Sequence, residues 1–150
     1  LNDGAAAVLM VSDRVFHHLG LTQGLRVVDT AAAGVDPNLL GIAPVASTQK
    51  LLSRQPGLTI DQIDLVEFNE AFAAQVLACL DELKIPEAKV NVGGGAIALG
   101  HPYGASGAIL VTRLFTEMVR ASQTPQAPRL GLATLGIAGG LGLSILFERL

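Results

Sequence analysis

Short apolar runs that alternate with segments of helical periodicity are the feature that most restricts how this chain can fold. Five such runs occupy residues 5–11, 26–33, 65–68, 129–135 and 141–148. Runs of roughly four to eight apolar residues bounded by turn signals are typical of buried strands. Segments with helical spacing lie between them, at residues 13–20, 45–55, 70–83 and 104–119. Strands alternating with helices predict an α/β layered domain, with a mixed five-stranded sheet and helices on both faces.

Local signals refine this outline. A short glycine-rich link, residues 136–140, joins the last two runs and predicts that they pair antiparallel. The polar, proline-containing residues 123–128 are expected to turn before that pair. Residues 59–62, Thr-Ile-Asp-Gln, fit a capping box at a helix start. Residues 71–80 are apolar on nearly all sides, which predicts a buried helix.

Composition excludes several classes of protein. The net charge of −3 and the scattered basic residues argue against binding of nucleic-acid phosphates, which needs a clustered basic face. No apolar run is long enough to span a bilayer. The single cysteine, Cys79, excludes an internal disulfide and a cysteine-based zinc site, and no metal site is predicted. A lone thiol is compatible with a reducing compartment and no signal peptide is recognisable, so we expect a cytoplasmic protein.

Residues 100–107, Gly-His-Pro-Tyr-Gly-Ala-Ser-Gly, form the richest candidate site. His101 lies just before a predicted helix start, where unpaired N–H groups and the positive dipole end favour negative charge. A histidine there can meet a developing negative charge or activate a nucleophile. The alternative is a glycine turn with an ordinary, partly exposed histidine. The glycine spacing fits neither the dinucleotide fingerprint nor a P-loop, which disfavours nucleotide binding.

Two further segments are candidates. Asn69 lies where the third apolar run meets a helix, so it is either the helix N-cap or an amide that positions a water or a substrate oxygen. The link at residues 136–140 is either a flexible hairpin turn or a loop whose backbone N–H groups bind an anion. Cys79 is expected to be buried packing. The chain therefore offers a base and an oxyanion site without an obvious nucleophile.

Together these segments resemble the C-terminal half of a thiolase of the acetyl-CoA acetyltransferase type. The matching motifs are Asn-Glu-Ala-Phe at 69–72, His-Pro-x-Gly-Ala-Ser-Gly at 101–107 and Ala-Thr-Leu-Gly-Ile-Ala-Gly-Gly at 133–140. Residues 1–7 look like the family's entry into that half, and residues 147–148 look like its exit. The related β-ketoacyl synthases usually carry threonine after the histidine and lack the first motif, so Pro102 and Asn69 favour a thiolase.

The resemblance implies two similar halves packed as five layers, and we expect residues 1–150 to be the C-terminal one, with the nucleophile-bearing half absent. That other half carries the cysteine that accepts the acyl group. His101 would activate this cysteine and bind the thioester oxygen, and Asn69 would hold the water of the same oxyanion hole. Ala138 would lend its N–H to a second oxyanion hole. The remaining residues expected to line the substrate are Gly100, Pro102 and Gly139.

The resemblance also implies a substrate and protein partners for the chain. A coenzyme A thioester would be the substrate, with no covalently bound cofactor, and the setting would be fatty acid metabolism. The N-terminal thiolase half and a homo-oligomer are the expected protein partners. We expect self-association because the apolar side of residues 104–119, left without the other half, would face water. The chain begins at Leu1 rather than Met, which suggests a piece of a longer protein.

One position departs from the family pattern. Gly136 stands where the second catalytic cysteine, the acid/base for the α-carbon proton, is expected. Glycine cannot titrate, so a contribution of roughly 10²–10⁴-fold is lost. Ala138 adds a methyl group that would shift the loop if its φ were positive. We hypothesise a thiolase half that supplies histidine and oxyanion-hole groups and is inactive alone. The alternative is a degenerate, non-catalytic subunit or acyl-CoA-binding module.

Overall fold

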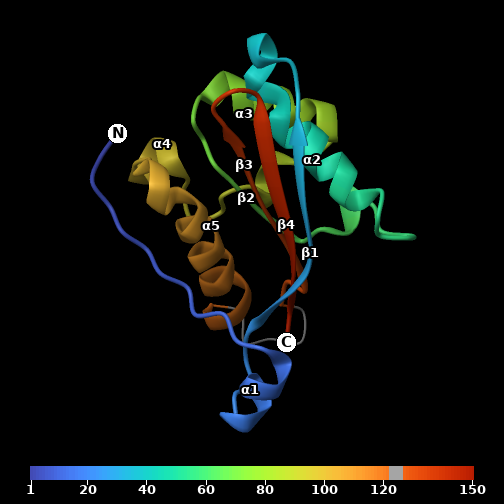
Figure 1. Ribbon diagram of the computed structural model, residues 1–150, viewed down its shortest axis with the longest axis vertical. Helices are drawn as coiled ribbons and strands as arrows, with labels where there is room; N and C mark the ends of the chain where they lie inside the picture. The colour runs from blue at the N-terminus through green and yellow to red at the C-terminus, as the bar shows by residue number, and fades with distance from the viewer. Residues whose placement is uncertain (122–126) are drawn as a thin grey trace.

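The computed structural model describes residues 1–121 and 127–150 and places one mixed sheet between two layers of helices (Figure 1). The sheet has the strand order β1-β4-β3-β2. Its strands are β1 (Leu25–Gly34), β2 (Leu65–Phe68), β3 (Leu130–Ile137) and β4 (Leu141–Arg149). β4 pairs antiparallel with both β1 and β3, as predicted for the last two runs, whereas β2 and β3 are parallel. The expected turn at 123–128 lies largely outside the described residues.

The prediction of five strands is wrong, because the sheet formed by the described residues has four. Residues 5–11 form no strand, and the side chains of Val8, Leu9 and Met10 are exposed. A strand requires a neighbouring backbone to pair with, and this apolar run has none in the described part of the chain. Beyond β2, the sheet continues only as an isolated parallel bridge between Val66 and Val90.

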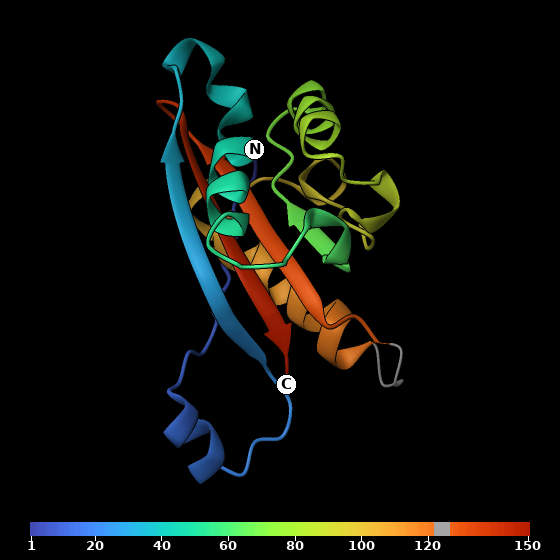
Figure 2. The same cartoon turned by 90° about the vertical axis from the view of Figure 1, so that its right-hand side faces the viewer.

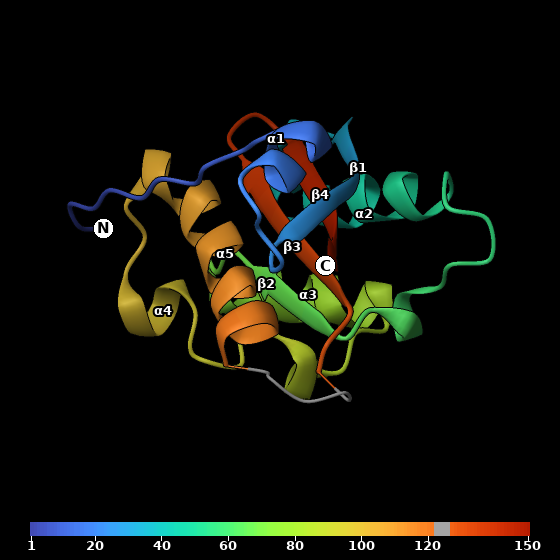
Figure 3. The same cartoon turned by 90° about the horizontal axis from the view of Figure 1, so that it is seen from below.

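The helices cover both faces of the sheet, as Figures 2 and 3 show from two directions. The longer ones are α1 (Asp13–His18), α2 (Ala43–Leu52), α3 (Ala73–Leu83) and α5 (Ser106–Phe115). The four-residue α4 (Ala96–Leu99) precedes the His101 loop, and a π-helical turn (Thr116–Arg120) extends α5. A 3-10 turn (Ile60–Gln62) carries the predicted capping box, in which Gln62 Oε1 accepts from Thr59 N at 2.8 Å. No helix among the described residues is both long and apolar enough to cross a membrane.

Two apolar cores hold these layers together. The larger core packs α2 and α3 against one face of the sheet and includes Leu51, Phe68 and Leu80. The smaller core packs α5 against the other face through Leu110 and Leu114. Burial of such side chains is the main favourable term for the fold.

The helix expected at residues 70–83 begins later and is less buried than predicted. α3 starts at Ala73, and only Val76, Cys79, Leu80 and Leu83 are buried, while Leu77 is 54% exposed. Its outer face meets no other layer among the described residues. Cys79 is buried as predicted, and its thiol donates to Gly41 O at 3.3 Å. Burial raises the pKa of Cys79 to about 11, which leaves it a thiol rather than a nucleophilic thiolate.

The α5 face of the sheet is only partly covered. Val27 and Thr30 of β1 pair with Phe147 and Ile145, whose side chains belong to the α5 core. Both β1 residues are nevertheless exposed, Val27 to 41%. α5 itself leaves no large apolar side chain exposed, so the expectation that this helix turns an apolar side to water is wrong. Beside α5, the exposed apolar side chain of this sheet face is Val27 of β1.

Candidate functional site

The candidate site lies where the parallel strands β2 and β3 end. Asn69 follows β2 directly, and its N–H donates to Thr134 O of β3 at 3.0 Å, which extends the parallel pairing by one residue. β3 then continues two residues to Gly136 at the same edge. The carboxyl edge of parallel strands is the usual ligand-binding edge of α/β sheets.

Asn69 and His101 meet at this edge. Asn69 is 2% exposed, and its Nδ2 lies 3.4 Å from His101 Nε2. His101 Nδ1 lies 2.6 Å from the Oγ of Ser106, the buried first residue of α5. A carboxamide nitrogen can only donate, so Nε2 accepts, and the Nδ1–H group donates to Ser106. In this arrangement the ring hydrogen lies on Nδ1, and Nε2 faces the Asn69 amide.

The alternative in which Asn69 caps the helix is wrong. The N-cap of α3 is Phe72, in an extended conformation and without a side-chain cap hydrogen bond. The Asn69 side chain turns instead toward His101. Ser106 was not foreseen, although its place five residues after His101, at a predicted helix start, is a signal that could have identified it.

Glu70 fixes the loop that leads to His101. Its Oε1 accepts from Asn91 Nδ2 at 2.7 Å and its Oε2 accepts from Ile97 N at 2.9 Å. Asn91 in turn donates to Phe68 O and accepts from Phe68 N, so its side chain continues the pairing of β2. A Cβ atom at Gly95 would collide with the Glu70 carboxylate. This cluster ties the segment before His101 to the strand that carries Asn69.

The N-terminal residues also contact this loop, which the sequence did not reveal. Gly100 has φ +110°, a conformation that favours glycine, and a Cβ there would collide with the Asn2 side chain. A Cβ at Gly4 would lie 2.8 Å from Pro102. Figure 1 shows the N-terminal segment passing beside α4 and α5. Gly100 and Pro102, predicted to line the substrate, therefore flank His101 and also contact the start of the chain.

Gly136 lies opposite Gly142 in the β3–β4 ladder and needs no left-handed backbone. A Cβ at Gly136 would have Gln75 Nε2 at 3.2 Å and Pro44 Cδ at 3.6 Å. The Gln75 carboxamide thus lies beside the position of the expected cysteine. Its Oε1 is buried without a hydrogen-bond partner in the described part of the chain. Only the tertiary packing of α3 on the sheet places this amide here.

The link after Gly136 is a hairpin turn. Gly139 and Gly140 have φ +80° and +83°, whereas Ala138 is outside the left-handed region. The Ala138 methyl group therefore causes none of the backbone strain that a positive φ would have imposed. Val35 N donates to Gly140 O at 2.8 Å, which ties the turn to the end of β1.

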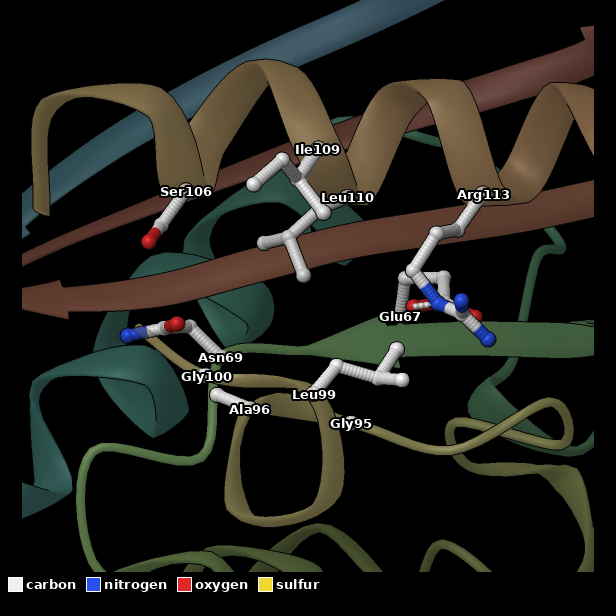
Figure 4. Close-up of a pocket in the computed structure, with 10 residues that line it drawn as sticks. All are labelled: Glu67, Asn69, Gly95, Ala96, Leu99, Gly100, Ser106, Ile109, Leu110 and Arg113. Carbon is white, nitrogen blue, oxygen red and sulfur yellow. Dashed lines mark hydrogen bonds and ion pairs between the residues drawn. The ribbon is translucent and has the colours of Figure 1, made fainter. Parts of the chain in front are cut away.

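A small cavity of about 20 Å³ adjoins Asn69 under α5 (Figure 4). Its polar lining comes from Glu67, Asn69, Ser106 and Arg113, and Leu110 is among its apolar residues. Glu67 is 2% exposed, and its Oε2 accepts from Arg113 Nε at 3.1 Å. Burial raises the pKa of Glu67 to about 7, although the guanidinium of Arg113 acts in the opposite direction. Sequence reasoning missed both residues, which lie 46 positions apart.

The site thus combines a paired amide and histidine at the end of parallel strands with a glycine hairpin beside them. The sequence matches the family "Thiolase, C-terminal domain" over residues 21–149, and the chain belongs to the thiolase family. Similar proteins include acetyl-CoA acetyltransferases and 3-ketoacyl-CoA thiolases. The putative acetyl-CoA C-acetyltransferase VraB of Staphylococcus epidermidis is 48% identical over 148 residues, covering 99% of this chain and 36% of the relative.

Two solved structures share the fold. The Bacillus anthracis acetyl-CoA acetyltransferase superposes with a TM-score of 0.84 at 37% identity, over 93% of this chain and 34% of its own. The Acat5 thiolase from Ascaris suum, in complex with coenzyme A, gives a TM-score of 0.81 at 40% identity, over the same shares of the two chains. The chain thus spans about a third of the length of these relatives.

Proposed function

We propose that this chain is the C-terminal half of an acyl-CoA acyltransferase of the acetyl-CoA C-acetyltransferase type. It supplies the histidine and the oxyanion-hole groups for thioester condensation or thiolysis. The observation that carries the proposal is the Asn69–His101–Ser106 arrangement, which presents an unprotonated Nε2 at the carboxyl edge of the parallel strands. A general base held in this way contributes roughly 10²–10⁴-fold to a rate.

In this proposal His101 acts first as a base and then as a donor. Nε2 takes the proton of the nucleophilic thiol, and the resulting Nε2–H group donates to the thioester oxygen. Ser106 continues to accept from Nδ1–H, which keeps the ring in place. Asn69 holds the water that completes this oxyanion hole, and Ala138 lends its N–H to a second one. Preorganised donors of this kind are each worth roughly 10²–10³-fold.

The remainder of the protein supplies what this chain does not hold. Residues 1–150 form the C-terminal domain in this proposal, and a nucleophile-bearing N-terminal half completes the site. The exposed sheet surface around Val27 and Thr30, beside α5, is one face that this half could cover. The substrate is an acyl-CoA, with Gly100, Pro102 and Gly139 along its path, and the coenzyme A complex of the Ascaris suum relative supports this. A cytoplasmic homo-oligomer is the assembly we propose.

A second function is favoured by one observation, which is that Gly136 has no side chain where the acid/base is expected. The protein would then bind an acyl-CoA without turning it over. Restoring the thiol with Gly136→Cys in the full-length gene product separates the two functions. A large gain in acetoacetyl-CoA thiolysis indicates an enzyme that lacks one proton-transfer group, whereas binding of acyl-CoA with no gain indicates a binding role.

The incompleteness of this chain is tested directly with acetoacetyl-CoA and free coenzyme A as substrates. The chain of residues 1–150 is expected to give no thiolysis above background, because its single thiol, Cys79, is buried in the larger core. The His101→Ala variant of the same chain is the matched control for background. Turnover by the unmodified chain above that control would contradict the proposal.

A further inference from the structure

Tyr103 has a backbone conformation that its side chain disfavours. Its φ of +30° lies in the left-handed region, where the Cβ atom of any residue except glycine crowds the following carbonyl oxygen. In the described part of the chain, Lys84 and Asn91 are the other residues besides glycine with a positive φ, and each has a local reason. Lys84 is the C-cap of α3, and Asn91 is a residue type that tolerates this conformation and is held through its side chain by Phe68. Tyr103 has neither reason.

Packing within the domain does not explain this strain, because Tyr103 is 67% exposed. Its ring instead contacts the imidazole of His101. The two ring centroids lie 5.0 Å apart and the ring planes meet at 70°, which is an edge-to-face arrangement that aromatic pairs favour. The same loop carries Gly100 where φ is +110°, and a glycine at 103 would likewise have removed the strain. The contact with His101 therefore accounts for a tyrosine at this position.

The hydrogen bonds of His101 leave one motion of its ring free. Nδ1 lies 2.6 Å from Ser106 Oγ, and Nε2 lies 3.4 Å from Asn69 Nδ2, so the two contacts hold the two ring nitrogens. Rocking of the ring about the line through these nitrogens leaves both donor–acceptor distances unchanged. A second ring packed edge to face against the imidazole opposes this rocking, because the motion would carry ring carbons into or away from the neighbour.

We infer that Tyr103 is a positioning residue for His101, and that the strained backbone at 103 places its ring against the imidazole. Backbone strain of this kind is found preferentially at functional sites. The value of this contact to catalysis rests on the proposed function, in which Nε2 must point first at the nucleophilic thiol and then at the thioester oxygen. A displacement of about 1 Å at such a group can cost as much as about 10²-fold in rate.

The first test measures transfer of the acyl group from acetyl-CoA to the full-length protein with three variants at this position. Tyr103→Phe keeps the ring and should keep the maximal rate of acyl transfer. Tyr103→Ala and Tyr103→Gly remove the ring, and each should lower the maximal rate about tenfold. The acetyl-CoA concentration that gives half of the maximal rate should stay unchanged in all three, because Tyr103 acts through His101 rather than by holding the substrate.

The second test compares the stability of the two variants that lack the ring, by urea unfolding of the chain of residues 1–150. Alanine is ordinarily the more stable residue of the two, because glycine loses more backbone freedom on folding. The positive φ at 103 should reverse this order, so the ratio of folded to unfolded chain should be about fivefold higher in Tyr103→Gly than in Tyr103→Ala. The more stable variant thus also loses the acyl-transfer rate, which a merely structural role of Tyr103 would not produce.

The third test follows the His101 ring itself and needs no turnover. Relaxation of ¹³C in the histidine rings of the labelled chain reports their motion on the picosecond-to-nanosecond timescale. The order parameter of the His101 ring should be kept in Tyr103→Phe and should fall toward that of the exposed His18 in Tyr103→Ala and Tyr103→Gly. An unmodified full-length protein that transfers no acyl group would contradict the proposed function, whereas an unchanged order parameter in Tyr103→Ala would overturn the present inference.

Lys84→Gly is the matched control. It relieves a φ of +59° at the exposed C-cap of α3 and should leave the acyl-transfer rate and the His101 order parameter unchanged. If Tyr103→Ala does not fold, Tyr103→Gly, which relieves the strain, gives the rate and the order parameter without the ring. An unmodified rate in Tyr103→Gly, an equal loss of rate in Tyr103→Phe, or a Tyr103→Ala protein more stable than Tyr103→Gly would each contradict the inference.

Discussion

Glu67 should make the stability of this domain fall as pH rises toward neutrality. Its side chain is 2% exposed, and burial raises its pKa from 4.5 to about 7. The folded state then binds a proton more tightly than the unfolded chain does. The stabilisation that this proton provides is complete below about pH 4.5 and is lost as pH rises through about 7. This difference in pKa between the folded and unfolded states corresponds to about 3 kcal/mol of stability, at 1.36 kcal/mol per pKa unit.

The assay is urea unfolding of the unmodified chain and of Glu67→Gln at several pH values between about 4.5 and 8.5. Subtracting the unfolding free energies of the two proteins at each pH cancels the contributions of the other titrating groups. One of these is Glu148, whose pKa is lowered by Arg26 and Arg129 and whose effect on stability has the opposite sign. The free energy of unfolding of the unmodified chain should fall by about 3 kcal/mol relative to the variant across this range, then level off. A difference that is constant with pH, or that rises with pH, would refute the reasoning.

Two further predictions concern glycines. Gly136→Cys should fold, because only the Gln75 amide must move, by a few tenths of an ångström. In the full-length enzyme this variant should raise the rate of thiolysis by roughly 10²–10⁴-fold. A variant that circular dichroism shows to be unfolded would contradict the packing described around Gly136. Gly142→Ala places a Cβ against the carbonyl of Ala43 and should cost about 1–3 kcal/mol in urea unfolding. Its control, Gly107→Ala, meets nothing within 4 Å in α5 and should stabilise by about 0.5–1 kcal/mol, so equal effects would contradict the account.

The sequence predicted most of the sheet, because apolar runs and glycine turns are local signals. The runs at 26–33 and 65–68 match β1 and β2 closely. The run at 5–11 has the same composition, but whether it forms a strand depends on a neighbouring backbone, which composition does not encode. The start of α3 was placed too early because Glu70 bonds Asn91 and Ile97 instead of entering the helix.

Only those residues of the candidate site that belong to a recognisable motif could be predicted from the sequence. Asn69 and His101 were found through their motifs, and the structure brings them to 3.4 Å. Glu67, Arg113 and Gln75 were missed. Glu67 is the one charged residue of the run at 65–68, and Arg113 lies within the helical segment 104–119, so neither belongs to a recognised motif. Their pairing depends on α5 crossing β2, a contact between elements far apart in the chain.

The most direct test of the central claim is transfer of the acyl group from radiolabelled acetyl-CoA to the full-length protein. This half-reaction needs the histidine and the oxyanion hole but not an acid/base at Gly136. The full-length protein should become labelled and release coenzyme A, and His101→Ala should be labelled at least about 100-fold more slowly. A full-length protein that takes up no label, or a His101→Ala variant labelled at the unmodified rate, would contradict the account.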